Sequence, residues 1–109
     1  MQGRTHNCGQ LRLENAGEKV TLVGWFENIR KVSKNLGFVI LRDFYGTTQI
    51  VVETEDLMEQ FSAINTESTI EVTGTVRERS SKNPKLATGD IEVVPENPNQ
   101  IVLFLPKHL

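Results

Sequence analysis

The stretch "GFVILRDFYGTTQIVV", residues 37–52, contains two short runs of alternating side chains joined by a turn. Such alternation is typical of β-strands, and "DFYG" has Asp first and Gly fourth, as type I turns favour. We therefore predict an antiparallel hairpin. Its inward face would hold four aliphatic residues: Val39, Leu41, Ile50 and Val52. Phe38 and Gln49 would then share the outward face.

The sequence on either side of the hairpin adds three strands and one helix. Strands are expected within residues 19–29, 68–79 and 90–94, and a helix within residues 54–65. Thr54 can cap this helix because its hydroxyl can accept a hydrogen bond from the first turn. Gly24 and Gly74 interrupt the first and fourth strands, which we interpret as bulges or sharp bends.

The order of these elements predicts the fold class. Three strands, a short helix and two strands are typical of an all-β, five-stranded OB-fold Greek-key barrel, with its helix between strands 3 and 4. Bends at glycine would help such a barrel close. A generic α+β sheet is the alternative. In the barrel, we expect Trp25, Phe26 and Phe61 to lie in the core.

We divide the chain into a barrel domain, residues 1–95, and a C-terminal tail, residues 96–109. At 109 residues the chain fits one small domain that can fold alone. The apolar run Ile101–Leu105 in the tail would either dock on the barrel or offer a strand to a second copy, giving self-association.

The composition excludes several classes of protein. With 38% hydrophobic and 24% charged residues, the chain is typical of a soluble globular protein. It has no apolar run long enough to cross a membrane and no secretory signal, so the cytoplasm is the expected compartment. With one cysteine and two histidines there is no zinc-binding pattern, and no motif for catalysis is present. We expect neither enzymatic activity nor a cofactor.

The charge pattern limits the kind of nucleic-acid binding that is possible. A net charge of −2 argues against indiscriminate binding, which depends on neutralising phosphates. Basic residues are nevertheless concentrated in residues 28–42 and 77–85. These stretches could meet as one positive surface or form two separate solvated loops.

Five residues are candidates for binding, because strands 2 and 3 form the usual binding platform of OB-folds. Phe38 could stack on an unpaired base, and Gln49 could donate to and accept from a base edge. Asn28 and Arg30 share a face of the first strand, and Glu92 could accept hydrogen bonds from a base. Taken alone, Phe38 fits either role, whereas the other four fit an ordinary surface residue better.

Several segments together resemble a known family. They are "RTHNCGQLRLENAGEKVTLVGW", "LGFVILRD", a Gly-x-x-Gln-x-Val pattern, "VTGTVR" and "ATGDIEVV". From about residue 4 to residue 95 the chain resembles the N-terminal anticodon-binding domain of bacterial-type aspartyl-tRNA synthetase. The opening "CGQLR" ahead of "VTLVGW" distinguishes it from the related lysyl and asparaginyl domains.

The resemblance implies a partner and roles for individual residues. The partner would be a tRNA anticodon stem-loop. Phe38 would stack on the central uridine of the anticodon, and Gln49 and Arg30 would read its polar edge. Asn83 would contact the loop, and Glu92 would help recognise the first anticodon base. ATP and Mg²⁺ would belong to a separate catalytic domain, whose motifs this chain lacks.

The sequence departs from the family at several positions. Asn28 stands where many members have arginine, and Val51 occupies a place that is often aromatic, so one stacking surface is lost. Pro84 and Lys85 replace a second asparagine in the connection between strands 4 and 5. Whether the full-length enzyme would also charge asparagine tRNA stays open.

Three hypotheses follow. The first is an anticodon-loop binding module of aspartyl-tRNA synthetase type. The second is a general single-stranded nucleic-acid-binding OB protein, against which the acidic pI near 5.7 counts. The third is a protein-interaction module that acts through the C-terminal tail, with the barrel as scaffold.

Overall fold

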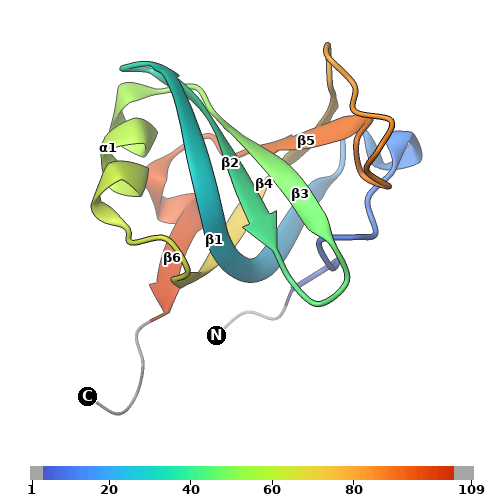
Figure 1. Cartoon of the computed structure of the whole chain (residues 1–109), viewed down its shortest axis with the longest axis horizontal. Helices are drawn as coiled ribbons and strands as arrows, with labels where there is room; N and C mark the ends of the chain where they lie inside the picture. The colour runs from blue at the N-terminus through green and yellow to red at the C-terminus, as the bar shows by residue number, and fades with distance from the viewer. Residues whose placement is uncertain (1–3, 105–109) are drawn as a thin grey trace.

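Six strands and one α-helix make up the computed structural model, which describes residues 4–104 (Figure 1). The strands are β1 (Lys19–Ser33), β2 (Leu36–Arg42), β3 (Thr47–Val52), β4 (Thr69–Glu78), β5 (Ile91–Val94) and β6 (Ile101–Phe104). The helices are α1 (Glu55–Ala63) and two short 3-10 helices, η1 (Leu13–Asn15) and η2 (Pro98–Gln100). Strands β1 to β5 close into a barrel with α1 between β3 and β4, which confirms the predicted OB-fold.

The long strand β1 closes the barrel by serving two partners. Its first half, from Lys19 to Trp25, pairs antiparallel with β4, and its second half, from Trp25 to Ser33, pairs antiparallel with β2. On the opposite side, β3 and β5 run parallel and share a single pair of partners, Ile50 and Val93. Because β1 changes partner at Trp25, its second half lies beside β2 and extends the outer face of β2 and β3.

The two strand glycines act through close packing rather than as bulges. A Cβ on Gly24 would lie 2.3 Å from the carbonyl oxygen of Arg42, and one on Gly74 would lie 2.8 Å from the backbone at the end of β5. The irregular pairing of β1 lies further along, with one register shift between Phe26 and Asn28. The expectation of a bulge at Gly24 was therefore wrong in position. The alternative, a sharp bend, fits the change of partner from β4 to β2 beside it, at Trp25.

Aliphatic side chains from every barrel strand fill the interior. The four inward residues of the hairpin are fully buried, as predicted. Phe26 of β1 and Phe61 of α1 meet edge to face with ring centroids 5.6 Å apart. Trp25, expected in the core, is only half-buried and packs edge to face with Phe44, at 5.5 Å. Alternation explains this, because Phe26 faces inward and its neighbour must face outward.

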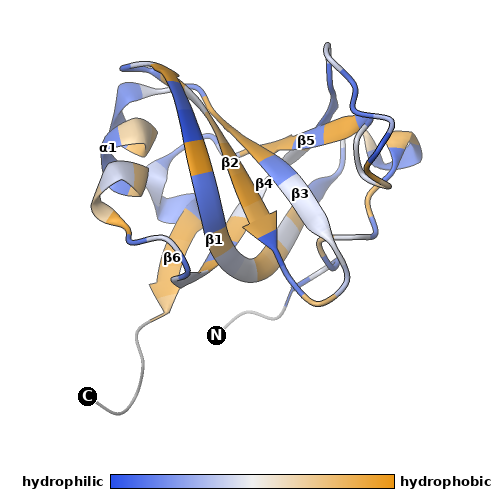
Figure 2. Cartoon of the chain, viewed as in Figure 1, coloured by the Kyte–Doolittle hydropathy of each residue, from blue (hydrophilic) through white to orange (hydrophobic). Residues whose placement is uncertain are grey.

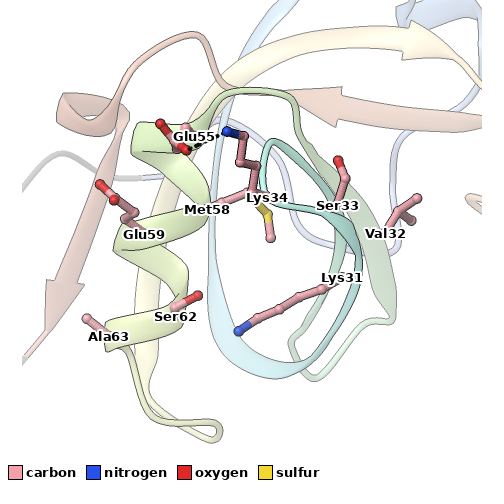
Figure 3. Close-up of a pocket in the computed structure, with 9 residues that line it drawn as sticks. All are labelled: Lys31, Val32, Ser33, Lys34, Glu55, Met58, Glu59, Ser62 and Ala63. Atoms are coloured by element: carbon pink, nitrogen blue, oxygen red, sulfur yellow. Dashed lines mark ion pairs between the residues drawn. The ribbon is translucent and has the colours of Figure 1, made fainter.

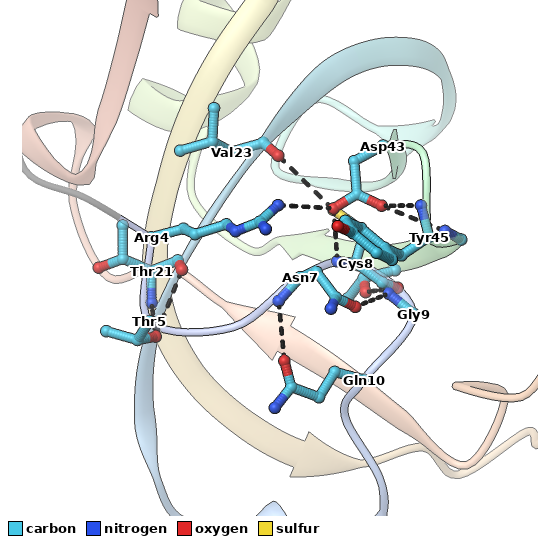
Figure 4. Close-up of polar contacts among 12 residues, drawn as sticks. Arg4, Thr5, Asn7, Cys8, Gly9, Gln10, Thr21, Val23, Asp43 and Tyr45 are labelled. Atoms are coloured by element: carbon cyan, nitrogen blue, oxygen red, sulfur yellow. Dashed lines mark hydrogen bonds and ion pairs between the residues drawn. The ribbon is translucent and has the colours of Figure 1, made fainter.

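The turn between β2 and β3 is tied to the N-terminal segment through Asp43 (Figure 4). One carboxylate oxygen accepts hydrogen bonds from the backbone N–H groups of Tyr45 (2.8 Å) and Gly46 (3.1 Å). The other accepts from the N–H of Cys8 at 2.8 Å and lies 3.7 Å from the guanidinium of Arg4. Burial raises the pKa of the Cys8 thiol far above its usual range, and the charge of Asp43 adds to the effect.

Helix α1 begins where the sequence predicted. The Thr54 hydroxyl accepts a hydrogen bond from the N–H of Leu57 at 3.2 Å, which confirms the N-cap. The helix buries Leu57, Met58 and Phe61 against the barrel. Within residues 4–104, no helix is long and apolar enough to cross a membrane.

The described part of the tail docks on the barrel. Strand β6 pairs antiparallel with β4, with Ile101 opposite Val72 and Phe104 opposite Thr69. The Gln60 side-chain amide donates to the carbonyl oxygens of residues 98 and 101, at 3.2 and 3.3 Å. This is the first of the two arrangements expected for the apolar run. Residues 105–109 lie outside the described residues, and they include Leu105, the end of that run.

Candidate nucleic-acid interface

A shallow groove crosses the outer face of β1, β2 and β3. It is lined by Asn28, Ile29, Arg30, Phe38, Ile40 and Gln49. Four of these are candidates from the sequence, and strand register explains why they meet. Arg30 lies directly opposite Phe38 on the β1–β2 ladder, and Ile40 lies opposite Gln49 on the β2–β3 ladder. Figure 2 shows the mixture, with hydrophilic residues along much of the upper part of β1 beside a mostly hydrophobic β2.

An arginine–aromatic pair forms part of the groove. The guanidinium carbon of Arg30 lies over the Phe38 ring, 4.9 Å from its centroid, which is within the range of a cation–π interaction. Phe38 is half-buried, while Arg30 is exposed. Val51 is paired with Phe38 on β3 and is 1% exposed, so it supports the sheet beside the ring and offers no stacking surface of its own.

Gln49 is held by a network of charged side chains next to the groove. Its amide nitrogen donates to one oxygen of Glu92 at 3.0 Å. The other Glu92 oxygen accepts from Nε of Arg77 at 2.9 Å and forms an ion pair with Nη2 at 2.8 Å. Nη1 and Nη2 of Arg77 donate to the two oxygens of Glu53, at 3.4 and 2.9 Å. The network therefore joins β3, β4 and β5 behind the groove.

The environment of Glu92 differs from the sequence expectation. Glu92 was expected to be available to accept hydrogen bonds from a base, but it is only 7% exposed and each of its oxygens already accepts a hydrogen bond. The hydrogen bond that Arg77 donates to Glu53 raises the pKa of Arg77, and the one that it donates to Glu92 adds to this effect. Sequence reasoning missed Arg77, because its place opposite Glu92 depends on the register of β4 and β5, for which the sequence carries no local signal.

Asn83 lies away from the groove. It is in the loop between β4 and β5, where its side-chain oxygen accepts from the N–H of Lys85 at 3.1 Å. Its backbone N–H donates to the carbonyl of Gly89 at 2.9 Å, which closes the loop. The same loop contacts the start of β3, since the Thr88 hydroxyl donates to the Thr47 carbonyl. The structure therefore brings five of the six candidates together and leaves Asn83 on an adjoining loop.

Four of the eight basic residues in residues 28–42 and 77–85 are paired with acids. In the described part of the chain, Lys34 pairs with Glu55, Arg42 with Glu27, Arg77 with Glu53 and Glu92, and Lys82 with Glu78. These pairs weaken the positive charge that the two stretches present. The guanidinium of Arg30 instead contacts the Phe38 ring, and its charge faces the groove.

A second depression lies between α1 and the turn that joins β1 to β2 (Figure 3). Lys31 and Lys34 line one side, and Glu55 and Glu59 line the other. The Lys34 ammonium lies 3.9 Å from the Glu55 carboxylate, so its charge is partly compensated. The residues that line this depression include no aromatic ring, and its two acids would repel phosphate. The groove at Phe38 is therefore the better candidate for nucleic acid.

The barrel and the outer-face groove define a class of protein, the OB-fold domains that bind single-stranded nucleic acid or oligosaccharide. Within this class, residues 20–97 match the family described as OB-fold nucleic acid binding domain, of tRNA anti-codon type, and the chain belongs to this family. The match covers all five barrel strands except the first residue of β1.

Relatives with similar sequences are aspartate–tRNA ligases. The chain is 48% identical over 94 residues to that of Mesoplasma florum and 49% identical over 94 residues to that of Parabacteroides distasonis. It is 47% identical over 96 residues to the aspartate–tRNA(Asp/Asn) ligase of Thermotoga neapolitana. These matches cover 84–86% of this chain but 16% of each relative. They confirm the resemblance to aspartyl-tRNA synthetase domains.

Solved structures share the same fold. The asparaginyl-tRNA synthetase of Pyrococcus horikoshii, complexed with asparaginyl-adenylate, has a TM-score of 0.74 and 26% identity, over 95% of this chain and 23% of that one. The OBody AM3L09 bound to hen egg-white lysozyme has a TM-score of 0.78 at 15% identity, over 95% and 97% of the two chains. At that identity the second match shows the fold alone.

Proposed function

We propose that this chain is the anticodon-binding domain of an aspartyl-tRNA synthetase and that its groove binds the anticodon loop of aspartate tRNA. The observation that supports this most directly is the meeting of Arg30, Phe38 and Gln49 in one groove on the face of β2 and β3. A ring, a cation and an amide there provide stacking, charge attraction and base-edge hydrogen bonds at one nucleotide.

The central uridine of the anticodon would occupy this groove. Its ring would stack on Phe38, an interaction worth about 1–3 kcal/mol per base. Arg30 and Gln49 would donate hydrogen bonds to its polar edge, and the carbonyl oxygen of Gln49 would accept one. Asn28, opposite Ile40 at the end of the groove, would add an amide where a longer arginine would reach further.

The other two candidates would act at neighbouring nucleotides. Glu92 lies beside Gln49, and its oxygens keep further lone pairs with which to accept from the first anticodon base. Asn83 would meet the anticodon loop from the connection between β4 and β5. By this proposal, aminoacylation and its need for ATP and Mg²⁺ belong to the much larger part of the relatives that this chain does not match.

Binding to short RNA hairpins tests the proposal. The chain is titrated against fluorescent anticodon stem-loops of aspartate, asparagine and lysine tRNA, an aspartate stem-loop with its central uridine replaced, and an unrelated oligonucleotide of equal length. We expect the aspartate stem-loop to bind most tightly and the replacement to weaken binding. Equal affinity for all five RNAs would reject anticodon recognition and favour a general single-strand binder. Comparable affinity for the aspartate and asparagine hairpins alone would indicate recognition of both tRNAs.

A further inference from the structure

We propose that Arg77 is a positioning residue that, through Glu92, fixes the orientation of the Gln49 amide and so sets a preference for uridine over cytidine in the groove. This inference rests on the proposed function and deepens it. Arg77 itself is outside the groove, so its effect on base choice would be indirect.

The geometry gives the amide one favourable orientation. Gln49 directs its nitrogen at Glu92, at 3.0 Å, and a carboxylate accepts hydrogen bonds but cannot donate them. Turning the amide over would place its carbonyl oxygen against the Glu92 oxygen. Two acceptors would then face each other at a buried site, where an unsatisfied polar contact is costly.

Arg77 holds the carboxylate that makes this choice. Its Nε and Nη2 atoms both contact the same Glu92 oxygen, which leaves the other oxygen directed at Gln49. The exposed Glu53 carboxylate also accepts a hydrogen bond from Nη2 of Arg77, at 2.9 Å. A guanidinium can satisfy both carboxylates because its donors are held in a rigid plane. Without Arg77, the Glu92 carboxylate would lose its main anchor and could turn away from Gln49, whose amide would then be free to turn.

An amide of fixed orientation distinguishes the two pyrimidines. The edge of uridine presents an N3–H donor next to the O4 acceptor, whereas cytidine presents the N3 acceptor next to the N4 amino donor. For a base stacked in one position, the two edges therefore require opposite orders of amide oxygen and nitrogen. An amide that can turn over accepts either base, and an amide that cannot turn over accepts one.

The test measures base preference rather than affinity alone. The dissociation constants of two stem-loops, identical except for uridine or cytidine at the central position, are compared for the unmodified chain, Arg77→Met and Lys19→Met. Lys19→Met removes the same unit of charge at the exposed start of β1 and is the matched control. We expect the uridine-to-cytidine preference to fall by at least about fivefold in Arg77→Met, since a bidentate base contact is worth about 1–3 kcal/mol of discrimination. Lys19→Met should keep the preference.

Two further variants and one spectrum keep the test decisive. In Glu92→Gln, the new amide can donate as well as accept, so Gln49 can turn over and the preference should also fall. If Arg77→Met does not fold, Arg77→Lys replaces it, because lysine keeps the charge but not the planar contact. In ¹⁵N spectra of the free chain, the Gln49 side-chain amide protons should be protected from exchange, and this protection should decrease in each variant.

The outcomes separate the two proposals. No binding, or no uridine preference in the unmodified chain, would reject the proposed function and this inference with it. A clear preference that persists in folded Arg77→Met or Arg77→Lys and in Glu92→Gln would overturn the role of Arg77 and leave anticodon recognition intact.

Discussion

Arg30 and Phe38 face each other across the β1–β2 ladder, with the guanidinium carbon 4.9 Å from the centroid of the ring. The contact places a cation and an aromatic surface at the same point of the groove before any ligand binds. Part of the entropy of ordering the arginine is therefore lost on folding rather than on binding.

Phe38→Ala is expected to weaken binding of the aspartate anticodon stem-loop by about 1–3 kcal/mol, because it removes the stacking surface. Fluorescence anisotropy measures the change. Phe44→Ala is the matched control, since Phe44 is 94% exposed and lies in the turn away from the groove. Equal losses in the two variants would contradict a specific role for Phe38.

The salt dependence of binding should be shallow. Because four of the eight basic residues in residues 28–42 and 77–85 are paired with acids, we expect about three phosphate contacts and a slope of about −2 for log K against log salt concentration. Titrations at several salt concentrations measure this slope. A much steeper slope, with similar affinity for unrelated oligonucleotides, would instead support the general single-strand binder.

Gly24→Ala is expected to destabilise the fold by about 3 kcal/mol or more, because the new methyl group would overlap the backbone carbonyl of Arg42. Gly37→Ala is the comparison, since its methyl group would meet the flexible thioether of Met58 at 2.8 Å. That side chain can move, so a loss of about 1 kcal/mol or less is expected. Urea unfolding gives both values, and a smaller loss at Gly24 than at Gly37 would contradict the argument.

The buried thiol of Cys8 should make stability depend on pH in the alkaline range. Burial, aided by Asp43, raises the pKa of Cys8 in the folded chain. Above the ordinary thiol pKa of about 8.5, the unfolded chain loses a proton that the folded chain keeps, so the free energy of unfolding falls by up to about 1.4 kcal/mol per pH unit. Below that pH the full stability is present. Urea unfolding between about pH 8 and pH 10 should show a steeper fall for the unmodified chain than for Cys8→Ala. Parallel curves of unfolding free energy against pH for the two proteins would contradict this role of the Cys8 thiol.

Removal of residues 99–109 should promote association rather than prevent it. Strand β6 covers the edge of β4 from Thr69 to Val72, and an uncovered strand edge can pair with another chain. Sedimentation at several concentrations should show a monomer for the full chain and larger species, or loss of folding, for the shortened one. The opposite pattern, with association only in the full chain, would support the tail as an interaction module.

Much of the fold was predictable because one face of each strand is buried. Alternation placed Val39 and Leu41 inside and brought Phe38 and Gln49 to one outer face. Trp25 was misplaced because its hydrophobicity was given more weight than its register beside Phe26. The glycines were recognised as special, but the carbonyl that approaches Gly24 comes from a distant strand and leaves no local signal.

The site was less predictable than the fold. The contact of Glu92 with Gln49 joins residues 43 positions apart, and its contact with Arg77 depends on the register of two strands. Neither pairing has a local signature in the sequence. Asn83 differs from these residues, because the hydrogen bonds that set its conformation, to Lys85 and Gly89, lie within its own loop.

The single-pair contact between β3 and β5 gives the groove a further property. In the described residues the ladder between these strands has one pair, Ile50 with Val93, which is the shortest ladder of the barrel. The hydrogen bond from Gln49 to Glu92 joins the same two strands. A ligand that requires this hydrogen bond binds only the closed barrel and therefore stabilises it by mass action. If RNA binds as proposed, the amide hydrogens of β5 should exchange more slowly in the complex, because recognition would be coupled to closure of the barrel.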